Sequence, residues 1–211
     1  MKLRHLAIGA AAAGLVAVSG PAFAAAPYTV AVNGSSAAGT HTVTATSTGT
    51  VEFSAKNDSG VVINMNCTGV TGSATVTSGP SVNNPIATIN STTWTSCVIP
   101  GGTAKVIQSG GWNINGTGTA TAGLESVAGN VDNINVGVEH AALAAICNFD
   151  IVAGTANGSI DEVNDQLKIN ETGYTGNLTL ANVNGCAGDL QDGNPANFKA
   201  TLNLSDSINL S

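Results

Sequence analysis

The sequence predicts an all-β protein, an antiparallel β-sandwich or barrel-like domain with two disulfides, preceded by a helical signal peptide. Short runs rich in Thr and Val alternate with Gly, Asn, Ser or Pro about every eight to twelve residues, as strands and turns do in antiparallel sheets. The chain contains four cysteines, an even number that favours two disulfides. Only 9% of the residues are charged, which argues against coiled coils and charged disordered tails.

The first segment, residues 1–24, has the three parts of a cleavable signal peptide. Lys2 and Arg4 make the start basic, residues 6–20 are apolar, and Ala22-Phe23-Ala24 supplies the small residues that signal peptidase requires. A membrane anchor is the weaker interpretation, because the apolar stretch has about 15 residues and a bilayer requires roughly 20. We therefore expect export of the chain.

Removal of the signal leaves residues 25–211, a length that fits a single all-β domain. This mature chain keeps four lysines against all 13 acidic residues, has no arginine and carries a net charge of −9. Binding to nucleic acid or to anionic lipid requires a basic surface, so both partners are excluded. No later stretch is apolar enough to cross a membrane, and we expect no membrane-spanning segment after cleavage.

The predicted strands alternate apolar and polar residues and end at turn signals. The first, 28–32, ends at Asn33-Gly34, a strong hairpin signal. The runs 41–46 and 50–55 also alternate, and 61–66 follows a turn and leads into Cys67. The remaining predicted strands are 73–77, 86–94, 104–108, 112–115, 131–138, 147–152, 166–169, 178–183 and 198–204.

Three segments have weaker patterns. Residues 138–146 contain good helix formers that fit two helical turns, although the β-patterned surroundings favour a strand. The Gly- and Thr-rich tract 116–123 is expected to form a loop or a mobile edge between the halves. Residues 25–50 hold the densest Ser, Thr and Gly sequence, and we expect a strand there that docks loosely.

The four cysteines, Cys67, Cys97, Cys147 and Cys186, allow three disulfide connectivities. We favour local pairing, Cys67 with Cys97 and Cys147 with Cys186, because each bond would then join neighbouring strands within its own half. Loops of this size contribute about 3–4 kcal/mol per bond in the chain-entropy model. Disulfides in turn indicate an oxidising compartment outside the cytosol.

The cysteines stand among further distinctive residues, namely Ile63-Asn-Met-Asn-Cys67, Trp94-x-x-Cys97, Trp112, Cys147, Asn184-Gly-Cys186-Ala-Gly188 and the closing stretch from Gly193 to Thr201. This succession resembles a group of exported actinobacterial proteins of unknown function that have a four-cysteine β domain. The resemblance covers about residues 60–205, and residues 25–50 depart from it. It implies a secreted, disulfide-linked β domain and brings no assigned activity.

Residue types that carry catalysis are scarce, and we predict neither an enzyme nor a cofactor or metal site. No Gly-x-Ser-x-Gly nucleophile elbow occurs. His41 lies in an alternating strand and is interpreted as a surface residue. Glu139 and His140 are adjacent, so on a strand they would point to opposite faces and would not cooperate. The spacing of the cysteines and histidines does not fit a structural zinc site.

Two acidic groups and two tryptophans are candidate binding residues. Asp161, Glu162 and Asp165 are interpreted as a solvated turn rather than a pair of glycosidase carboxylates. The stretch 189–194 offers oxygen ligands for calcium, but a polar turn is the favoured interpretation. The candidate ligand contacts are Trp94 and Trp112, although a core position for each is favoured over a sugar platform.

The leading hypothesis is a secreted or cell-envelope-associated, non-enzymatic β protein with a structural or interaction role and unknown partners, among them cell-wall or surface components. One alternative is an extracellular ligand-binding module, and a weaker one is an envelope pore subunit. Exposed tryptophans beside carboxylates would favour a polysaccharide ligand. An apolar cavity lined by residues such as Ile63, Val106 and Ile146 would favour a small apolar molecule.

Overall fold

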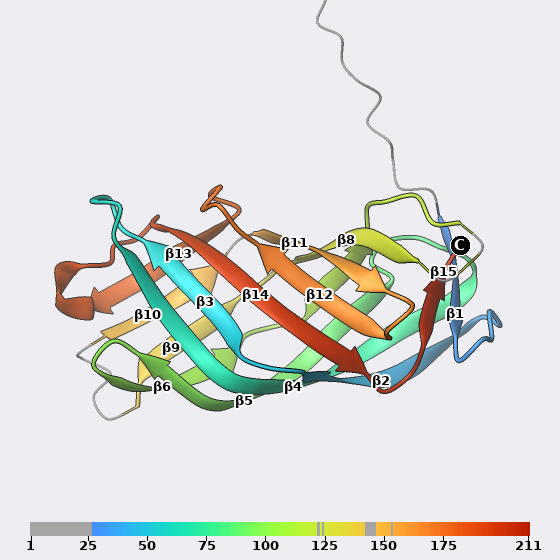
Figure 1. Cartoon of the computed structure of the whole chain (residues 1–211), viewed down its shortest axis with the longest axis horizontal. Coiled ribbons are helices and arrows are strands. Elements are labelled where there is room, and N and C mark those ends of the chain that lie inside the picture. The colour runs from blue at the N-terminus through green and yellow to red at the C-terminus, as the bar shows by residue number, and fades with distance from the viewer. Residues whose placement is uncertain (1–26, 122, 124, 142–146, 153) are drawn as a thin grey trace, which may run out of the picture.

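The computed structural model describes residues 27–121, 123, 125–141, 147–152 and 154–211. Within them the strands pair antiparallel and join one 15-stranded sheet, which confirms the predicted all-β class (Figure 1). The predicted signal peptide, residues 1–24, lies outside the described residues.

The strands are β1 (Tyr28–Val32), β2 (Gly39–Ser47), β3 (Val51–Lys56), β4 (Val62–Val82), β5 (Ala87–Ile99), β6 (Gly102–Gln108), β7 (Trp112–Gly116), β8 (Ser126–Asp132), β9 (Val136–His140), β10 (Cys147–Val152), β11 (Thr155–Asp161), β12 (Gln166–Glu171), β13 (Leu178–Gly185), β14 (Pro195–Leu204) and β15 (Ile208–Leu210). A short 3-10 turn, η1 (Cys186–Gly188), follows β13.

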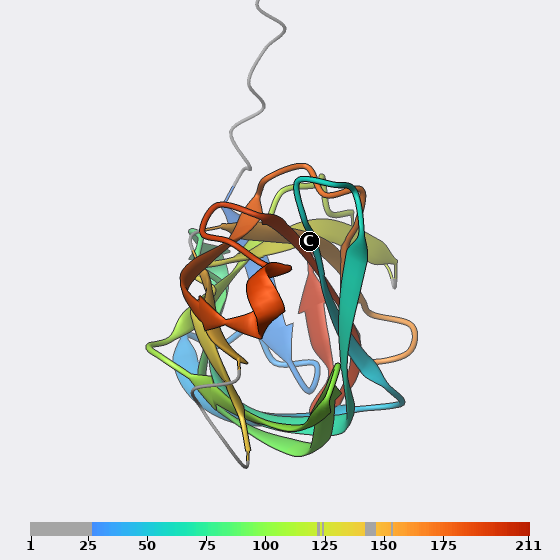
Figure 2. The same ribbon diagram turned by 90° about the vertical axis from the view of Figure 1, so that its left-hand side faces the viewer.

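The sheet closes on itself in two rings that share one wall. The shared wall consists of β14, then β2 and β3 in succession, then β4 and β5. At one end β6, β9, β10 and β13 connect β5 to β14, and at the other end β7, β8, β11 and β12 make the same connection. The result is an elongated, barrel-like body, seen lengthwise in Figure 1 and from one end in Figure 2.

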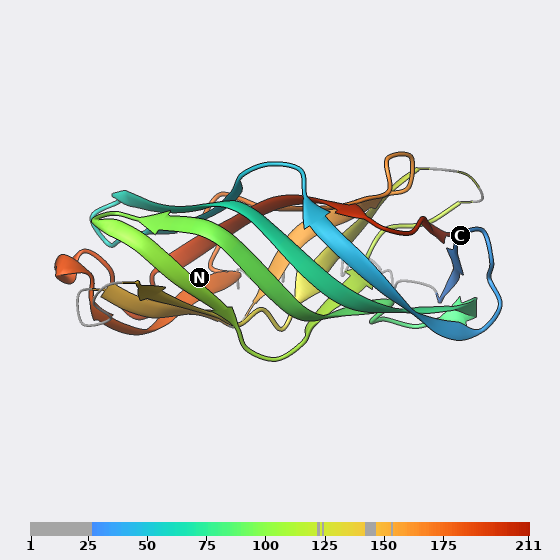
Figure 3. The ribbon, with the colours of Figure 1, turned by 90° about the horizontal axis from the view of Figure 1, so that it is seen from below.

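Both disulfides belong to the first of these rings, and we call its end of the molecule the disulfide end. The opposite end holds β1 and β15, which pair with each other while β1 also pairs with β4. Figure 3 shows β2, β4 and β5 running diagonally along the length of the shared wall between the two ends.

Alternation along each strand explains why the chain is so rich in threonine. On β2 the side chains of Val43 and Ala45 are buried, while Thr40, Thr42 and Thr44 between and before them are exposed. The paired residues on β4 repeat the pattern, because Thr40 lies opposite Thr77. β-Branched Thr favours the extended backbone and leaves a hydroxyl in water, so it covers the outside of the sheet while Val, Ile and Ala fill the inside.

The N-terminal segment is attached more tightly than its Ser- and Gly-rich sequence led us to expect. β1 lies between β4 and β15, and Val30 has no exposed surface. β2 pairs with β4 over eight residue pairs, from Gly39 with Ser78 to Thr46 with Thr71. Both strands are thereby fixed by long-range pairing that a local pattern does not reveal.

Other differences concern strand boundaries. β4 joins the predicted runs 61–66 and 73–77 into one strand, whereas the predicted strand 131–138 divides into β8 and β9 at a turn in which Asn133 has a φ of 58°. β11, with the sequence Thr-Ala-Asn-Gly-Ser-Ile-Asp, was not predicted because it has little apolar alternation. In 138–146 the strand preference holds for 138–140, and 142–146 lie outside the described residues.

Candidate functional site

The two disulfides have the connectivity that the sequence favours, Cys67 with Cys97 and Cys147 with Cys186. Cys67 and Cys97 are directly opposite each other on β4 and β5, so this bond reinforces an existing strand pair. Cys147 starts β10, and Cys186 starts η1 just after β13, so the second bond fixes the loop that follows β13. Disulfides of this kind persist in oxidising compartments.

An apolar cavity of about 130 Å³ lies at the disulfide end, inside the first ring. One wall comes from β3, β4 and the end of β5, and the facing wall comes from β10 and β13. η1 and the loop after it contribute Cys186, Asp189 and Leu190, and Figure 2 shows this loop in front of the ring. The remaining apolar lining consists of Phe53, Ala55, Ile63, Met65, Ile99, Pro100, Cys147, Phe149, Ile151, Leu180, Ala187 and Ala196.

The base of the cavity is an aromatic cluster in the middle of the molecule. Phe53 lines the cavity and stacks on Phe198, with ring centroids 4.3 Å apart and an interplanar angle of 3°. Trp112 meets Phe198 edge-on at 6.1 Å, and Trp94 lies 5.5 Å from Phe53. These four rings supply much of the aromatic area that the composition makes scarce, and they fix the position of Phe53.

The two tryptophans that the sequence offered as ligand contacts do not line this cavity. Trp112 is 2% exposed and is a core side chain, and Trp94 is partly buried against the same core. Of the residues named for an apolar cavity, Ile63 lines it, Val106 does not, and Ile146 lies outside the described residues.

Sequence reasoning missed Phe53, Phe149 and Leu180 as cavity residues, because each alternates like any core residue of a strand. Only the closure of the sheet brings β3 opposite β10 and β13. No local signal marks such residues as different from the rest of the core.

The polar groups at the cavity belong to Ser54, Asn64 and Asp189. Ser54 Oγ accepts a hydrogen bond of 2.8 Å from the hydroxyl of Tyr174. Asn64 and Asp189 are exposed. Among the described residues the carboxylate of Asp189 has no hydrogen bond or ion pair, and only its backbone N–H is engaged, with the carbonyl of Cys186.

The two histidines among the described residues, His41 and His140, occupy structural positions. His41 on β2 is partly buried, and its Nε2 lies 2.9 Å from Ser78 Oγ. His140 at the end of β9 is 8% exposed, with Nε2 3.4 Å from the carbonyl of Gly101, whereas its neighbour Glu139 is partly exposed. Within the described part of the chain no three His, Cys, Asp or Glu side chains converge as a metal site would require.

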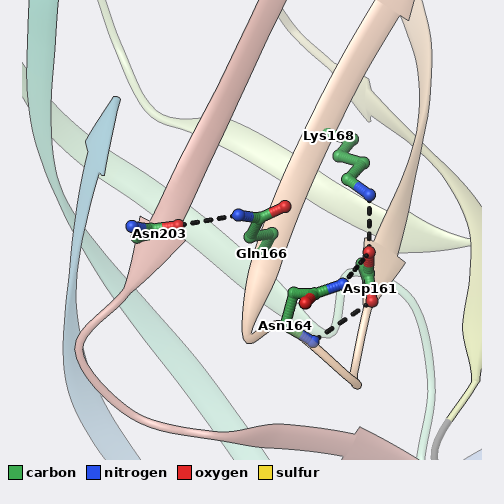
Figure 4. A network of polar contacts seen from close by, with 5 residues as sticks. All are labelled: Asp161, Asn164, Gln166, Lys168 and Asn203. Carbon is green, nitrogen blue, oxygen red and sulfur yellow. Dashed lines mark hydrogen bonds and ion pairs between the residues drawn. The ribbon is translucent and has the colours of Figure 1, made fainter. Parts of the chain in front are cut away.

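The predicted solvated turn around Asp161, Glu162 and Asp165 was wrong for its first two members, which are 6% and 2% exposed. Asp161 is buried because donors surround it: Lys168 Nζ at 2.5 Å, Asn164 Nδ2 at 2.9 Å and the Asn164 backbone N–H at 3.2 Å. Figure 4 shows this network at the turn between β11 and β12, with Gln166 donating to Asn203 beside it.

Glu162 is held beneath β15 at the same end of the molecule. Its Oε1 accepts the backbone N–H of Leu210 at 2.6 Å, and its Oε2 accepts the N–H of Glu125. Burial raises the pKa of Glu162, the two hydrogen bonds oppose that rise, and the charge of Glu125 adds to it. These carboxylates therefore join strands at the end opposite the cavity.

We expect Asp161 to make the protein less stable in acid. The hydrogen bond from Lys168, followed by that from Asn164, lowers the pKa of Asp161 from 3.8 to about 2. A lowered folded-state pKa stabilises the fold above the unfolded value, and this stabilisation is lost as the pH falls from about 4 through about 2. Urea unfolding of the mature protein from pH 5 to pH 2 should show a smaller acid loss for Asp161→Asn than for wild type. Asp165→Asn, in the same turn, is the control, and equal acid slopes for wild type and Asp161→Asn would contradict this role.

The fold and site together define a disulfide-linked, closed antiparallel β protein with an apolar cavity between its walls at the disulfide end. The chain matches no protein-family model, no curated protein and no solved structure. The resemblance to exported actinobacterial proteins therefore stays a prediction. In the described part of the chain, no helix has the length and apolar character needed to cross a membrane.

Proposed function

We propose that this is an exported, non-enzymatic β protein that binds a small apolar molecule in the cavity at the disulfide end. The observation that carries the proposal is the cavity itself, about 130 Å³ in volume and lined mainly by aliphatic and aromatic side chains. Ligand sites in closed antiparallel sheets are found between the walls at an end of this kind.

The size of the cavity limits the ligand. An engineered apolar cavity of about 150 Å³ holds benzene and stays dry without it. A cavity of about 130 Å³ is therefore suited to a single ring or a short branched chain rather than a sugar chain. Phe53 and Phe149 offer ring faces or edges for such a group.

The structural or interaction role that the sequence suggested first remains compatible with this fold, but the cavity supports the ligand-binding alternative by a specific feature. Trp112 is buried, so the tryptophan platform expected of a polysaccharide site is not supported. The predicted signal at 1–24 and the two disulfides support export to the medium or the cell surface. Fractionation of the native host would test this location.

A cavity-filling substitution tests the binding site. Ala55 is 5% exposed and lines the cavity, so Ala55→Leu should place three further carbon atoms in the space that a ligand needs. We expect toluene to bind the mature wild-type protein saturably in an NMR chemical-shift titration, and the variant to bind about tenfold more weakly or not at all.

The matched control for this test is Ala181→Leu. Ala181 alternates on β13 with the buried cavity residue Leu180, so its side chain points out of the ring. This variant should bind toluene as wild type does. Absence of saturable toluene binding to wild type, or equal binding to all three proteins, would contradict the proposed site.

A further inference from the structure

We infer that the ligand of this cavity carries a cationic or strongly hydrogen-bond-donating head group, which Asp189 recognises at the edge of the apolar site. This inference rests on the proposed function, because it assigns the chemical class of the molecule bound at the same site. It predicts a small amine with one ring or a short branched chain, in preference to the corresponding alcohol or carboxylate.

Asp189 lies at the cavity, close to the disulfide between Cys147 and Cys186. It follows η1 directly, so the disulfide between Cys147 and Cys186 fixes the backbone just before it, and all three residues line the cavity. Its carboxylate has no partner among the described residues, whereas other acidic side chains near this loop are engaged. Asp192 Oδ1 accepts the N–H of Val183, and Asp58 Oδ1 accepts from Asn194.

The other polar residues at the cavity, Asn64 and Ser54, limit the kind of head group that can bind there. Asn64 offers an amide that both donates and accepts, and Ser54 Oγ already accepts from Tyr174. Of the described residues that line the cavity, none is a lysine, arginine or histidine. Lys56, the next residue along from the lining residue Ala55, has its Nζ 6.0 Å from the centroid of the Tyr174 ring. An anionic head would therefore meet Asp189 without a cation in the lining to offset it.

The negative net charge of the whole protein also favours a cationic ligand. The full chain carries a net charge of −7, and the chain after the predicted signal carries four lysines against 13 acidic residues. Such a protein attracts cations to its surface and slows the approach of anions. The apolar walls then hold the body of the ligand, and the exposed carboxylate selects its head.

The test compares three ligands of the same shape, namely benzylamine, benzyl alcohol and benzoate, by NMR chemical-shift titration of the mature protein at pH 7. We expect benzylamine to bind about fivefold more tightly than benzyl alcohol, and benzoate to bind most weakly. Asp189→Asn should bring the amine and the alcohol to equal affinity. Asp189→Glu should retain the preference.

Asp165→Asn removes the same charge at the far end of the molecule and is the control for the general field. It should leave the amine preference within about twofold of wild type, because the charge is distant from the cavity. Equal affinity for all three ligands, tighter binding of benzoate, or an unchanged preference in Asp189→Asn would overturn the inference while leaving the cavity as a binding site. Failure of all three ligands, and of toluene, to bind would overturn the proposed function and this inference with it.

Discussion

Replacing Trp112 with alanine is expected to cost about 3–5 kcal/mol of unfolding free energy, the usual range for removing a large buried aromatic side chain. Trp112 is 2% exposed and contacts Phe198 and Trp94, at centroid distances of 6.1 and 6.5 Å. Urea unfolding followed by circular dichroism measures the loss. Because aromatic residues make up only 4% of the chain, the remaining core has few large side chains with which to refill the space.

Two controls separate ring packing from the indole N–H. Trp112 Nε1 is buried and has no hydrogen-bond partner among the described residues. Trp112→Phe therefore keeps most of the packing and removes an unpaired donor, so it should cost less than half as much as alanine. Trp94→Ala should also cost less, because Trp94 is only partly buried. A loss below about 1 kcal/mol for Trp112→Ala would contradict the aromatic cluster as the centre of the core.

Removing the disulfide between Cys147 and Cys186 should produce the second large effect. Its loop has a sequence separation of 39 residues, and the chain-entropy model then gives a loss of about 4 kcal/mol for the Cys147→Ala/Cys186→Ala double variant. Toluene binding should fall as well, because both cysteines line the cavity and the bond fixes the loop that carries Leu190. Urea unfolding and the toluene titration are the two measurements.

The Cys67→Ala/Cys97→Ala double variant is the matched control. Its loop has a separation of 30 residues, so the expected loss of stability is similar. Neither cysteine lines the cavity, and each already pairs with the other across β4 and β5. Toluene binding should therefore be retained under conditions where this variant is folded. An equal loss of binding in the two double variants would show that stability, and not the loop at the cavity, controls the site.

Much of the fold could be predicted from the sequence because short stretches of residues indicate it. Alternation of apolar with polar residues predicts β2 and β3, and the local cysteine spacing gives the correct disulfide connectivity. What the local pattern lacks is pairing between distant segments. β11 contains Thr-Ala-Asn-Gly-Ser and forms a strand because β8 and β12 offer it partners on both sides.

The candidate site was harder to predict for the same reason. Phe53 and Leu180 are 127 positions apart, each on a strand that alternates as other core strands do, and only sheet closure places them at one cavity. Asp189 was visible as part of a polar turn, but its position beside the cavity depends on the bond between Cys147 and Cys186. The burial of Asp161 and Glu162 depends on hydrogen-bond donors, Lys168 for Asp161 and the backbone N–H of Leu210 for Glu162. A cluster of charged residues in the sequence does not reveal these donors, so it predicts a solvated turn.

Intermolecular NOEs test most directly whether a small apolar molecule binds between the walls of the disulfide end. The measurement uses the mature, oxidised protein with assigned side chains in the presence of saturating toluene. We expect NOEs from the toluene ring to Phe53, Phe149 and Leu180, which line the cavity from β3, β10 and β13. NOEs confined to residues outside the cavity, or none at saturating toluene, would contradict binding at this site.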